Sequence, residues 1–516
     1  MIIIYHSNNK IVKVTNDNTI SIEFDNAITI AAFLSILAKE YPDVILVWCH
    51  VNFKEHLNLS EIKKIFHHKK LLLSFSPSEN LFIDKSIGYI DQSPFALINR
   101  NVTFASWQMS SNVGGIHADV ILALNNLIPF DENFDYFLCS LSKLGIQKGL
   151  LCYSEPSLLK QNFNGFSIKP SKYTLFRFVK QHYKTRWVFL LLLNLVLYER
   201  KFPLLPLLFS LFYKNRNDVN LNLDYILVQS SRKVLNKRSI DVIIPTIGRK
   251  KYLYDVLKDF SKQILLPNKI IIVEQNPAEE SETELNYIQE EKWPFEIQHL
   301  FIHQSGACNA RNIALKQTDS EWVFFADDDI RIENNFIQKI FEPITAFGAK
   351  AVSTKCYQNG NNSLKDNIIL QWPTFGAGCS FVKSELLEKV KFNKGYEFGY
   401  GEDGDFGMQL RNQGVDILYL PEPSILHLKA PIGGFRSKPQ LQWQNDSIQP
   451  KPSPTIMLYY ILNSTQEQIK GYKTTLFFKY YQHQKIKNPI CYFLNYKKQW
   501  KRSVFWANNL NKQNEV

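Results

Sequence analysis

The segment 321–336, EWVFFADDDIRIENNF, constrains the fold of this 516-residue chain more than any other. Four apolar residues and Ala326 predict a buried β-strand, and three aspartates, Asp327, Asp328 and Asp329, follow it directly. Ligands of open α/β sheets bind at the carboxyl ends of the strands. Because adjacent carboxylates repel one another unless a cation shares their charge, the segment predicts a metal site at a sheet edge. Asp327 and Asp329 would bind Mg²⁺ or Mn²⁺ there, together with a substrate diphosphate.

A second acidic segment supports this interpretation. The aspartates alone could form a solvated turn, with Asp329 capping a helix directly after it. However, GEDGDFGMQLRNQG (401–414) places Glu402, Asp403 and Asp405 at the start of another predicted helix, behind the aromatic and glycine-rich GYEFGYG. Acids in that position suit a general base that meets an acceptor hydroxyl, although acids are also common in the first turn of any helix.

Two further segments bring polar residues to the ligand-binding edge. IDVIIP and KIIIVEQ predict two strands around the helical YLYDVLKDFSKQ, which indicates a right-handed parallel unit. IIPTIGR ends the first of these strands, and GACNARNIAL contains a glycine-opened turn before a helix, a combination that suits a nucleotide diphosphate. The residues concerned are Pro245, Thr246, Arg249, Arg311 and Asn312.

Four motifs in order, P-T-x-G-R, G-x-x-x-A-R-N, D-D-D and G-E-D-x-D, resemble the family 2 inverting glycosyltransferases with the GT-A fold. The resemblance covers about 239–430 and includes galactofuranosyltransferase-like and rhamnosyltransferase-like members. It implies that Asp327 and Asp329 bind metal and nucleotide sugar, with Asp328 beside them in the donor site. It also implies that Asp403 deprotonates the acceptor, with Glu402 as the competing base.

The resemblance extends to the donor site and to a third metal ligand. In galactofuranosyltransferase-like members a histidine downstream of the base completes the metal site, and His427 stands in a comparable place, although a lone histidine is more often structural. Glu274 stands where many relatives have aspartate. The positions that match nucleoside contacts are Pro245, Thr246, Glu274 and Arg311.

The implied activity is a single displacement with inversion at the anomeric carbon, assisted by a divalent metal (Mn²⁺ or Mg²⁺). The implied partners are a nucleotide-sugar donor and a glycan or lipid-linked acceptor, in bacterial surface-polysaccharide synthesis. The residues that select the donor and the acceptor would lie in loops such as 356–377 and 428–445. The sequence of these loops does not identify the sugar or the acceptor. A nucleotidyltransferase is the nearest alternative, but VIIPTIGRKK lacks the expected glycine-rich phosphate loop. A non-catalytic nucleotide-sugar-binding scaffold is the other alternative.

The N-terminal part predicts a second α/β domain. MIIIY, DVILVWCHV and KLLLSF are typical of buried strands, and 28–41 and 59–66 of helices. LCYSEPSLLK (151–160) resembles LYLPEPSILH (418–427), ENFDYFLCSLSKLG resembles EDGDFGMQLRNQG, and KPSKYTLFRF (169–178) faintly resembles KPSPTIMLYY. We therefore expect a diverged, GT-A-like repeat, with an unrelated α/β domain as the alternative.

This second module should be non-catalytic. The alignment puts Asn133 at the position of Asp403 and Lys160 at that of His427, and no D-x-D occurs in the first 160 residues. An amide is no base near neutral pH, and a charged ammonium cannot bind a metal.

The sequence thus predicts four regions of an α/β protein. They are a degenerate GT-A-like domain (1–165), an apolar and basic helical linker (166–236), a GT-A catalytic domain with a Rossmann-like mixed sheet (237–440) and a basic aromatic helical tail (441–516). The longest apolar run of the linker is about 12 residues, too short for the ~20 that a membrane span needs. It would form either a buried inter-domain helix pair or a segment lying in a membrane surface.

Charge and cysteine content bound the partners and the compartment. The net charge of +12 favours anionic partners, and residues from 465 onward carry ten Lys and Arg against two Glu among many aromatic residues. Such a tail suits an anionic membrane surface or is simply solvated. No nucleic-acid-binding signature occurs, and a homo-oligomer is compatible with the sequence. Seven scattered cysteines and the absence of a signal peptide predict a cytoplasmic protein, with peripheral attachment to the inner face of the cytoplasmic membrane as the alternative.

Overall fold

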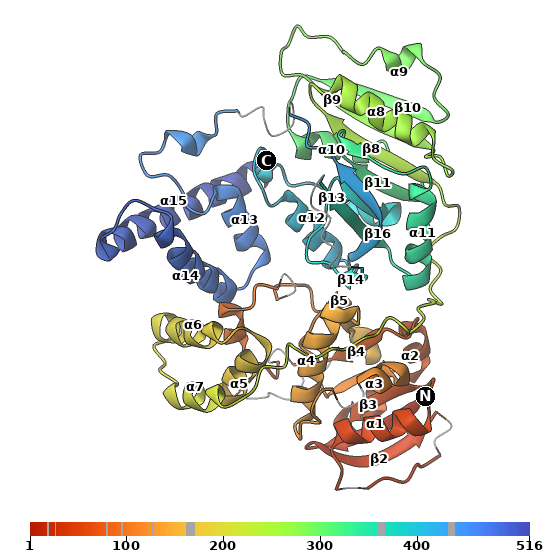
Figure 1. Ribbon diagram of the computed structural model, residues 1–516, viewed down its shortest axis with the longest axis vertical. Helices are drawn as coiled ribbons and strands as arrows, with labels where there is room; N and C mark the ends of the chain where they lie inside the picture. Colours follow the sequence, from red (N-terminus) through yellow and green to blue (C-terminus); the bar gives the residue numbers. More distant parts are fainter. Residues whose placement is uncertain are drawn as a thin grey trace. The chain divides into compact units, whose positions relative to one another are not determined.

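The structure, a computed structural model, divides into two compact units (Figure 1). The first unit is Met1–Arg232 with Thr465–Thr475, and the second unit is Lys233–Ser464 with Leu476–Val516. The predicted loops 356–377 and 428–445 and the predicted repeat at 169–178 lie in part outside the described residues. The structure describes residues 1–515 except 18–19, 26, 79–80, 94–95, 125–126, 161–170, 359–366 and 432–438.

The second unit is built on a mixed sheet of strand order β10-β9-β8-β11-β15-β13-β16-β12, with β14 paired to β16. The strands β8, β9, β10 and β11 run parallel to one another, as the sequence predicts for the first two, and β15 runs antiparallel to β11. The strands are β8 (Ile240–Thr246), β9 (Lys269–Gln275), β10 (Glu296–Ile302), β11 (Trp322–Ala326), β12 (Ile330–Arg331), β13 (Ala351–Tyr357), β14 (Leu370–Gln371), β15 (Cys379–Lys383) and β16 (Leu418–His427).

Helices cover this sheet and form the C-terminal region. In α8, apolar residues three and four apart, among them Leu253, Val256 and Phe260, are buried, as expected for an amphipathic helix on a sheet. The helix α10 contacts β8 and β9, and α11 contacts β16. The helices are α8 (Lys250–Ser261), α9 (Tyr287–Glu290), α10 (Ala307–Leu315), α11 (Phe336–Phe347), α12 (Glu402–Arg411), α13 (Pro454–Asn463), α14 (Gln466–Gln482, shared with the first unit) and α15 (Pro489–Glu515).

The strand before the three aspartates forms the centre of the core. All five residues of β11 are buried, and the ring of Phe324 stacks on that of Phe381 in β15 at a centroid distance of 4.1 Å. The alternative of a helix directly after Asp329 is wrong, because Ile330 and Arg331 pair with β16 as a short strand. The aspartates therefore occupy a turn between two strands.

The first unit has a seven-stranded sheet of order β2-β1-β3-β6-β4-β7-β5. The predicted strands and helices of 1–160 occur as β1, β3, β4, α1 and α2. The elements are β1 (Ile2–Ser7), β2 (Lys10–Asn16), β3 (Ile45–His50), β4 (Leu71–Phe75), β5 (Phe104–Ala105), β6 (Val113–His117), β7 (Leu151–Ser154), α1 (Ile30–Glu40), α2 (Leu59–Ile65), α3 (Ala118–Leu124), α4 (Phe134–Gly145), α5 (Lys172–His182), α6 (Arg186–Asn194) and α7 (Leu204–Leu211).

The two sheets share a topology over six strands. The order β1-β3-β6-β4-β7-β5 in the first unit corresponds to β8-β11-β15-β13-β16-β14 in the second. In both sheets the successive pairs are parallel, antiparallel, antiparallel, parallel and antiparallel. The corresponding strands also follow one another in the same order along the chain.

The predicted linker forms helices that belong to the first unit. Val188, Leu191 and Leu195, from α6 and the π-helical turn that follows it, are buried in one cluster with Phe176 and Val179 of α5. No helix in the described part of the chain has the length and apolarity that a membrane crossing requires.

Candidate active site

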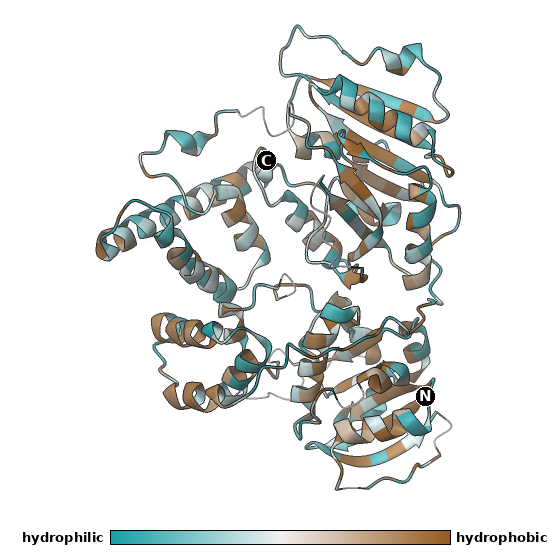
Figure 2. Ribbon diagram, in the orientation of Figure 1, coloured by the Kyte–Doolittle hydropathy of each residue, from teal (hydrophilic) through white to brown (hydrophobic). Residues whose placement is uncertain are grey.

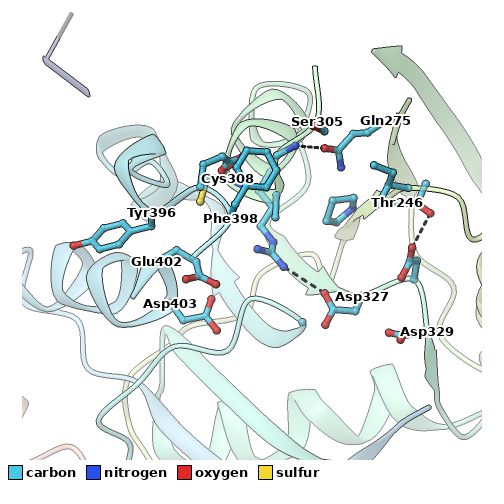
Figure 3. Close-up of a pocket in the computed structure, with 18 of the residues that line it drawn as sticks. Thr246, Gln275, Ser305, Cys308, Asp327, Asp329, Tyr396, Phe398, Glu402 and Asp403 are labelled. Carbon is cyan, nitrogen blue, oxygen red and sulfur yellow. Dashed lines mark hydrogen bonds and ion pairs between the residues drawn. The ribbon is translucent and has the colours of Figure 1, made fainter. Parts of the chain in front are cut away.

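A pocket of about 570 Å³ opens at the carboxyl ends of β8, β9 and β11 in the second unit (Figure 3). Motifs more than 150 residues apart in the sequence meet there because the parallel strands end at one edge of the sheet. Ten of the twelve predicted site residues line this pocket: Pro245, Thr246, Arg249, Arg311, Asp327, Asp328, Asp329, Glu402, Asp403 and His427.

The middle aspartate, Asp328, holds the turn together. Its carboxylate accepts hydrogen bonds from the Thr246 hydroxyl (2.7 Å) and from Nη1 of Arg249 (2.6 Å). Burial raises its pKa to about 6, against the opposing effect of the Arg249 cation. Both carboxylate oxygens thus have donors from the P-T-x-G-R segment, which ties the ends of β8 and β11 together.

The outer aspartates and His427 form a cluster that could hold a metal ion. One potential ligand atom of each of Asp327, Asp329 and His427 lies within 4.8 Å of the others. Nε2 of His427 lies 3.1 Å from Oδ1 of Asp329, which raises the pKa of the imidazole. The other oxygen of Asp329 accepts the backbone N–H of Ala430 at 2.8 Å, so this carboxylate is fixed in place.

Asp327 is the accessible member of the cluster. Its side chain is one-third exposed, whereas that of Asp329 is buried. A Cβ on Gly378, in the turn before β15, would lie only 2.1 Å from Oδ2 of Asp327. The residue at 378 must therefore be glycine for Asp327 to keep this position.

Two arginines balance the acidic charge. Arg249 lies 2.6 Å from Asp328 and 3.3 Å from Asp329. Arg311, buried on α10, lies 3.3 Å from Oδ1 of Asp327. The carboxylates of Asp327 and Asp403 both act to raise the pKa of the Arg311 guanidinium, so this cation lies close to both acidic groups of the pocket.

Glu402 and Asp403 enter the pocket from the first turn of α12, opposite the cluster of Asp327 and Asp329 (Figure 3). Burial, reinforced by the neighbouring Glu402 carboxylate, raises the pKa of Asp403 to about 7, and burial also raises the pKa of Glu402. Oδ1 of Asp403 accepts the backbone N–H of Ala377 at 3.3 Å. Asp405 instead points into the protein, where Asn463 donates to it at 2.9 Å. A carboxylate with a pKa near neutrality is suited to accept a proton.

Two predicted donor-site residues lie outside the residues that line the pocket. The Glu274 carboxylate accepts hydrogen bonds from Thr283 (2.5 Å) and from the backbone of Glu284 (3.2 Å). The Asn312 carboxamide bonds to both the C=O and the N–H of Phe392 (2.7 and 2.8 Å). Their donor-binding roles stay predictions, and the structure gives both side chains a function in holding neighbouring segments.

Glu397 is a pocket residue that the sequence analysis did not identify. Its carboxylate accepts the backbone N–H groups of Cys308 (3.0 Å) and Asn309 (3.1 Å) at the start of α10. The close approach requires glycine at 306, where φ is +144° and a Cβ would lie 2.0 Å from Oε1 of Glu397. The one acid within the aromatic GYEFGYG run was the available signal. Glu397 thus fastens the segment before α12 to α10.

The comparisons with known proteins agree with the motifs. Residues 241–401 match the model of the family described as glycosyl transferase family 2, which confirms the resemblance. The galactofuranosyl or rhamnosyl type stays a prediction. A comparison with curated proteins found no match.

Solved structures of S. aureus TarS are similar to part of this chain. Residues 1–349 of TarS are 18% identical, with a TM-score of 0.31, over 37% of this chain and 60% of that one. The same protein in complex with UDP-GlcNAc is 17% identical, with a TM-score of 0.35, over 46% and 70%. The chain thus spans 60% of the length of the first of these structures.

Proposed function

We propose that the glycosyltransferase region of this chain, whose match to family 2 spans 241–401, uses the pocket to transfer a sugar from a nucleotide-sugar donor to an acceptor hydroxyl. The reaction is a metal-assisted single displacement that inverts the anomeric carbon. One observation carries the proposal. A cluster with metal-ligand chemistry, Asp327, Asp329 and His427, faces a carboxylate with a raised pKa, Asp403, across a single pocket.

The cluster fits a divalent cation. Two carboxylates and one imidazole supply oxygen and nitrogen ligands of the kind that Mn²⁺ and Mg²⁺ bind. Oδ1 of Asp329 is buried, and His427 is the group that lies beside it among the described residues. When bound there, the cation would neutralise charge on the departing nucleoside diphosphate.

The other side chains of the pocket accept the proton and bind the phosphates. Asp403 accepts the proton of the acceptor hydroxyl as the acceptor oxygen forms its bond to the anomeric carbon. The bond from that carbon to the diphosphate oxygen breaks, and its electron pair leaves with the diphosphate. Arg311, buried between Asp327 and Asp403, and the exposed Lys429 at the pocket rim offer positive charge to the phosphates.

A donor panel tests the proposal. The full chain is incubated with nucleotide sugars and Mn²⁺, and release of nucleoside diphosphate is measured with and without a chelator. We expect metal-dependent release with at least one donor. Donor binding without release, in the presence of candidate acceptors, would instead support the scaffold alternative, and absence of both would contradict the proposal.

The first unit, in our proposal, is a diverged copy of the second that does not bind donor. The shared strand order supports a duplication, and so do two glycines. A Cβ on Gly114 would lie 2.4 Å from Cζ2 of Trp48, its partner in the β3–β6 ladder. Gly378 meets Asp327 in the same way, one residue beyond the last pair of the β11–β15 ladder. Trp48 would therefore take the place of Asp327, and His50 that of the third aspartate.

The helix before β7 refines the alignment made from the sequence, because α4 precedes β7 as α12 precedes β16. Asp135 is the second residue of α4, as Asp403 is of α12, and each accepts a backbone N–H from two residues before the preceding strand (Ser111 at 2.7 Å, Ala377 at 3.3 Å). Asn133 is instead the N-cap of α4. The helix position supports Asp135, where the sequence alignment has Asn133, as the counterpart of Asp403 in our proposal. Asp135 also accepts the Ser111 hydroxyl at 2.8 Å and is buried, so no substrate could use it.

Nucleotide binding tests the inactivity of the first unit. In the full chain, replacing Asp327 and Asp329 by asparagine should abolish Mn²⁺-dependent donor binding in calorimetry, because the remaining unit lacks a metal-ligand pair at the corresponding strand end. Residual metal-dependent binding by a chain that remains folded would show that the first unit binds donor.

We further propose a glycan or lipid-linked acceptor, in bacterial surface-polysaccharide synthesis, and a cytoplasmic protein attached to the inner face of the membrane. The net charge of +12 and the basic C-terminal region support an anionic surface as a partner. Transfer to a lipid-linked acceptor in vesicles tests this proposal, and transfer only to water-soluble glycans would contradict it.

A further inference from the structure

The segment from the end of α6 through α7 exposes many large apolar side chains, on both sides of the charged residues Glu199, Arg200 and Lys201. The ribbon of α7 is largely hydrophobic in Figure 2. Phe212 is 86% exposed and Phe202 66% exposed. Soluble monomers rarely expose apolar patches of more than a few hundred Å². We call this surface the α6–α7 face, and its defining residues are Leu197, Phe202, Leu205, Leu208, Phe209 and Phe212.

The opposite side of the same helices is also apolar. Val188, Leu191 and Leu207 are buried against α5 in the core of the first unit. A helix that is apolar all round is normally covered on every side. The composition of the α6–α7 face is therefore typical of a surface that is buried in an apolar environment.

Basic side chains surround this face. Between 183 and 215 the only acid is Glu199, which lies 2.9 Å from Lys201. Four exposed cations, Lys184, Arg186, Arg200 and Lys214, take part in none of the ion pairs between described residues. A protein partner would have to supply matching acids, whereas an anionic lipid surface provides acyl chains and negative headgroups together.

We propose that the α6–α7 face lies in the headgroup region of an anionic bilayer, parallel to the membrane plane. Helix α7 has eight residues and α6 nine, lengths that suit a segment lying in the interface. Leu and Phe side chains enter the acyl boundary, while the four unpaired cations contact phosphates. This inference identifies the attaching surface and does not rest on the proposed transferase reaction.

Vesicle flotation of the full chain tests the proposal. We expect binding to vesicles of phosphatidylcholine with phosphatidylglycerol, and weaker binding to phosphatidylcholine alone or at high salt. The double variant Phe209→Ser/Phe212→Ser should lower the partition coefficient by about tenfold or more, because two large apolar groups leave the interface. The matched control is Leu227→Ser, which changes an apolar residue that is 85% exposed but lies outside α5–α7. The control should bind as the wild type does.

Three results would overturn the proposal. One is the absence of wild-type binding to anionic vesicles. Another is unchanged binding by a folded double variant, with loss instead in a Lys497→Gln/Lys498→Gln variant of α15, which would assign attachment to the C-terminal region. The third is a dimer of the wild-type chain in light scattering, a monomer for the double variant, and no vesicle binding by either. That result would make the face a subunit interface.

Discussion

Replacing Asp403 by asparagine tests its proposed role as the general base with little change to the shape of the pocket. Asparagine keeps the size of the side chain, and its Oδ1 can still accept the N–H of Ala377, which lies 3.3 Å from the carboxylate. The substitution removes the ability to take a proton, together with the negative charge near Arg311. General-base catalysis contributes about 10²- to 10⁴-fold, so we expect kcat to fall by that factor while the Kd of the donor changes by less than about threefold.

The pH profile gives an independent readout of the same group. Burial and the Glu402 carboxylate raise the pKa of Asp403 to about 7, so the carboxyl is protonated and inactive as a base below that pH. About nine tenths would be ionised at pH 8 and about one tenth at pH 6, so kcat/KM at saturating Mn²⁺ should fall about tenfold between them. The residual activity of Asp403→Asn should not show this step.

The assay is single-turnover transfer, with donor affinity measured by calorimetry on the same preparations. Wild-type turnover by Asp403→Asn would refute the assignment. If Glu402→Gln alone abolished transfer and the pH step, the base would be Glu402. If both variants lost donor binding as well, the two acids would serve the donor site and the proposed division of the pocket would be wrong.

Three further predictions follow from the contacts in the pocket. Asp329→Asn should weaken Mn²⁺ binding, measured by calorimetry, by at least about tenfold, because a fixed ligand charge is lost; unchanged affinity would exclude it as a ligand. Gly378→Ala places a Cβ where Oδ2 of Asp327 lies, so metal affinity should fall by about tenfold with little change in the unfolding temperature; normal metal binding would contradict this geometry. Glu397→Gln removes the charge that holds the backbone of Cys308 and Asn309, and should lower kcat by about tenfold with nearly normal metal affinity; an unchanged kcat would show that the contact has no catalytic role.

The sequence predicted those site residues whose position depends on local pattern. A run of apolar residues ending in three aspartates predicts a buried strand that delivers carboxylates to a sheet edge, and β11 does this. Glu274 and Asn312 have the same polar character, but their partners lie outside the motifs. Thr283 follows β9 in a loop, and Phe392 is 80 residues from Asn312. Glu397 was missed for the same reason, since its importance depends on the approach of α10.

The C-terminal region shows the limit of composition as a guide. Its many aromatic and basic residues predicted a membrane-facing or solvated tail. Tyr492, Tyr496 and Trp500 of α15 are buried, and α15 packs on α13 in the second unit. An aromatic residue in a helix can lie in a core or on a surface, and the residues packed against it determine which. The apolar α6–α7 face, by contrast, stays uncovered in the structure.

The two units together indicate what a sheet of this topology needs in order to act on a nucleotide sugar. Both units share the strand order over six strands and have an aspartate at the second position of the helix that precedes β7 or β16. In the second unit that aspartate meets a pocket because the facing strand ends in Asp327, whose side chain leaves space. In the first unit we propose that Trp48 takes the corresponding place, and Ser111 donates both its backbone N–H and its hydroxyl to Asp135. If Asp403 is the base and the first unit is a diverged copy, as we propose, activity depends less on retaining that aspartate than on a polar and open strand end facing it. Creating such a pocket in the first unit would then require changes at Trp48 as well as at Ser111.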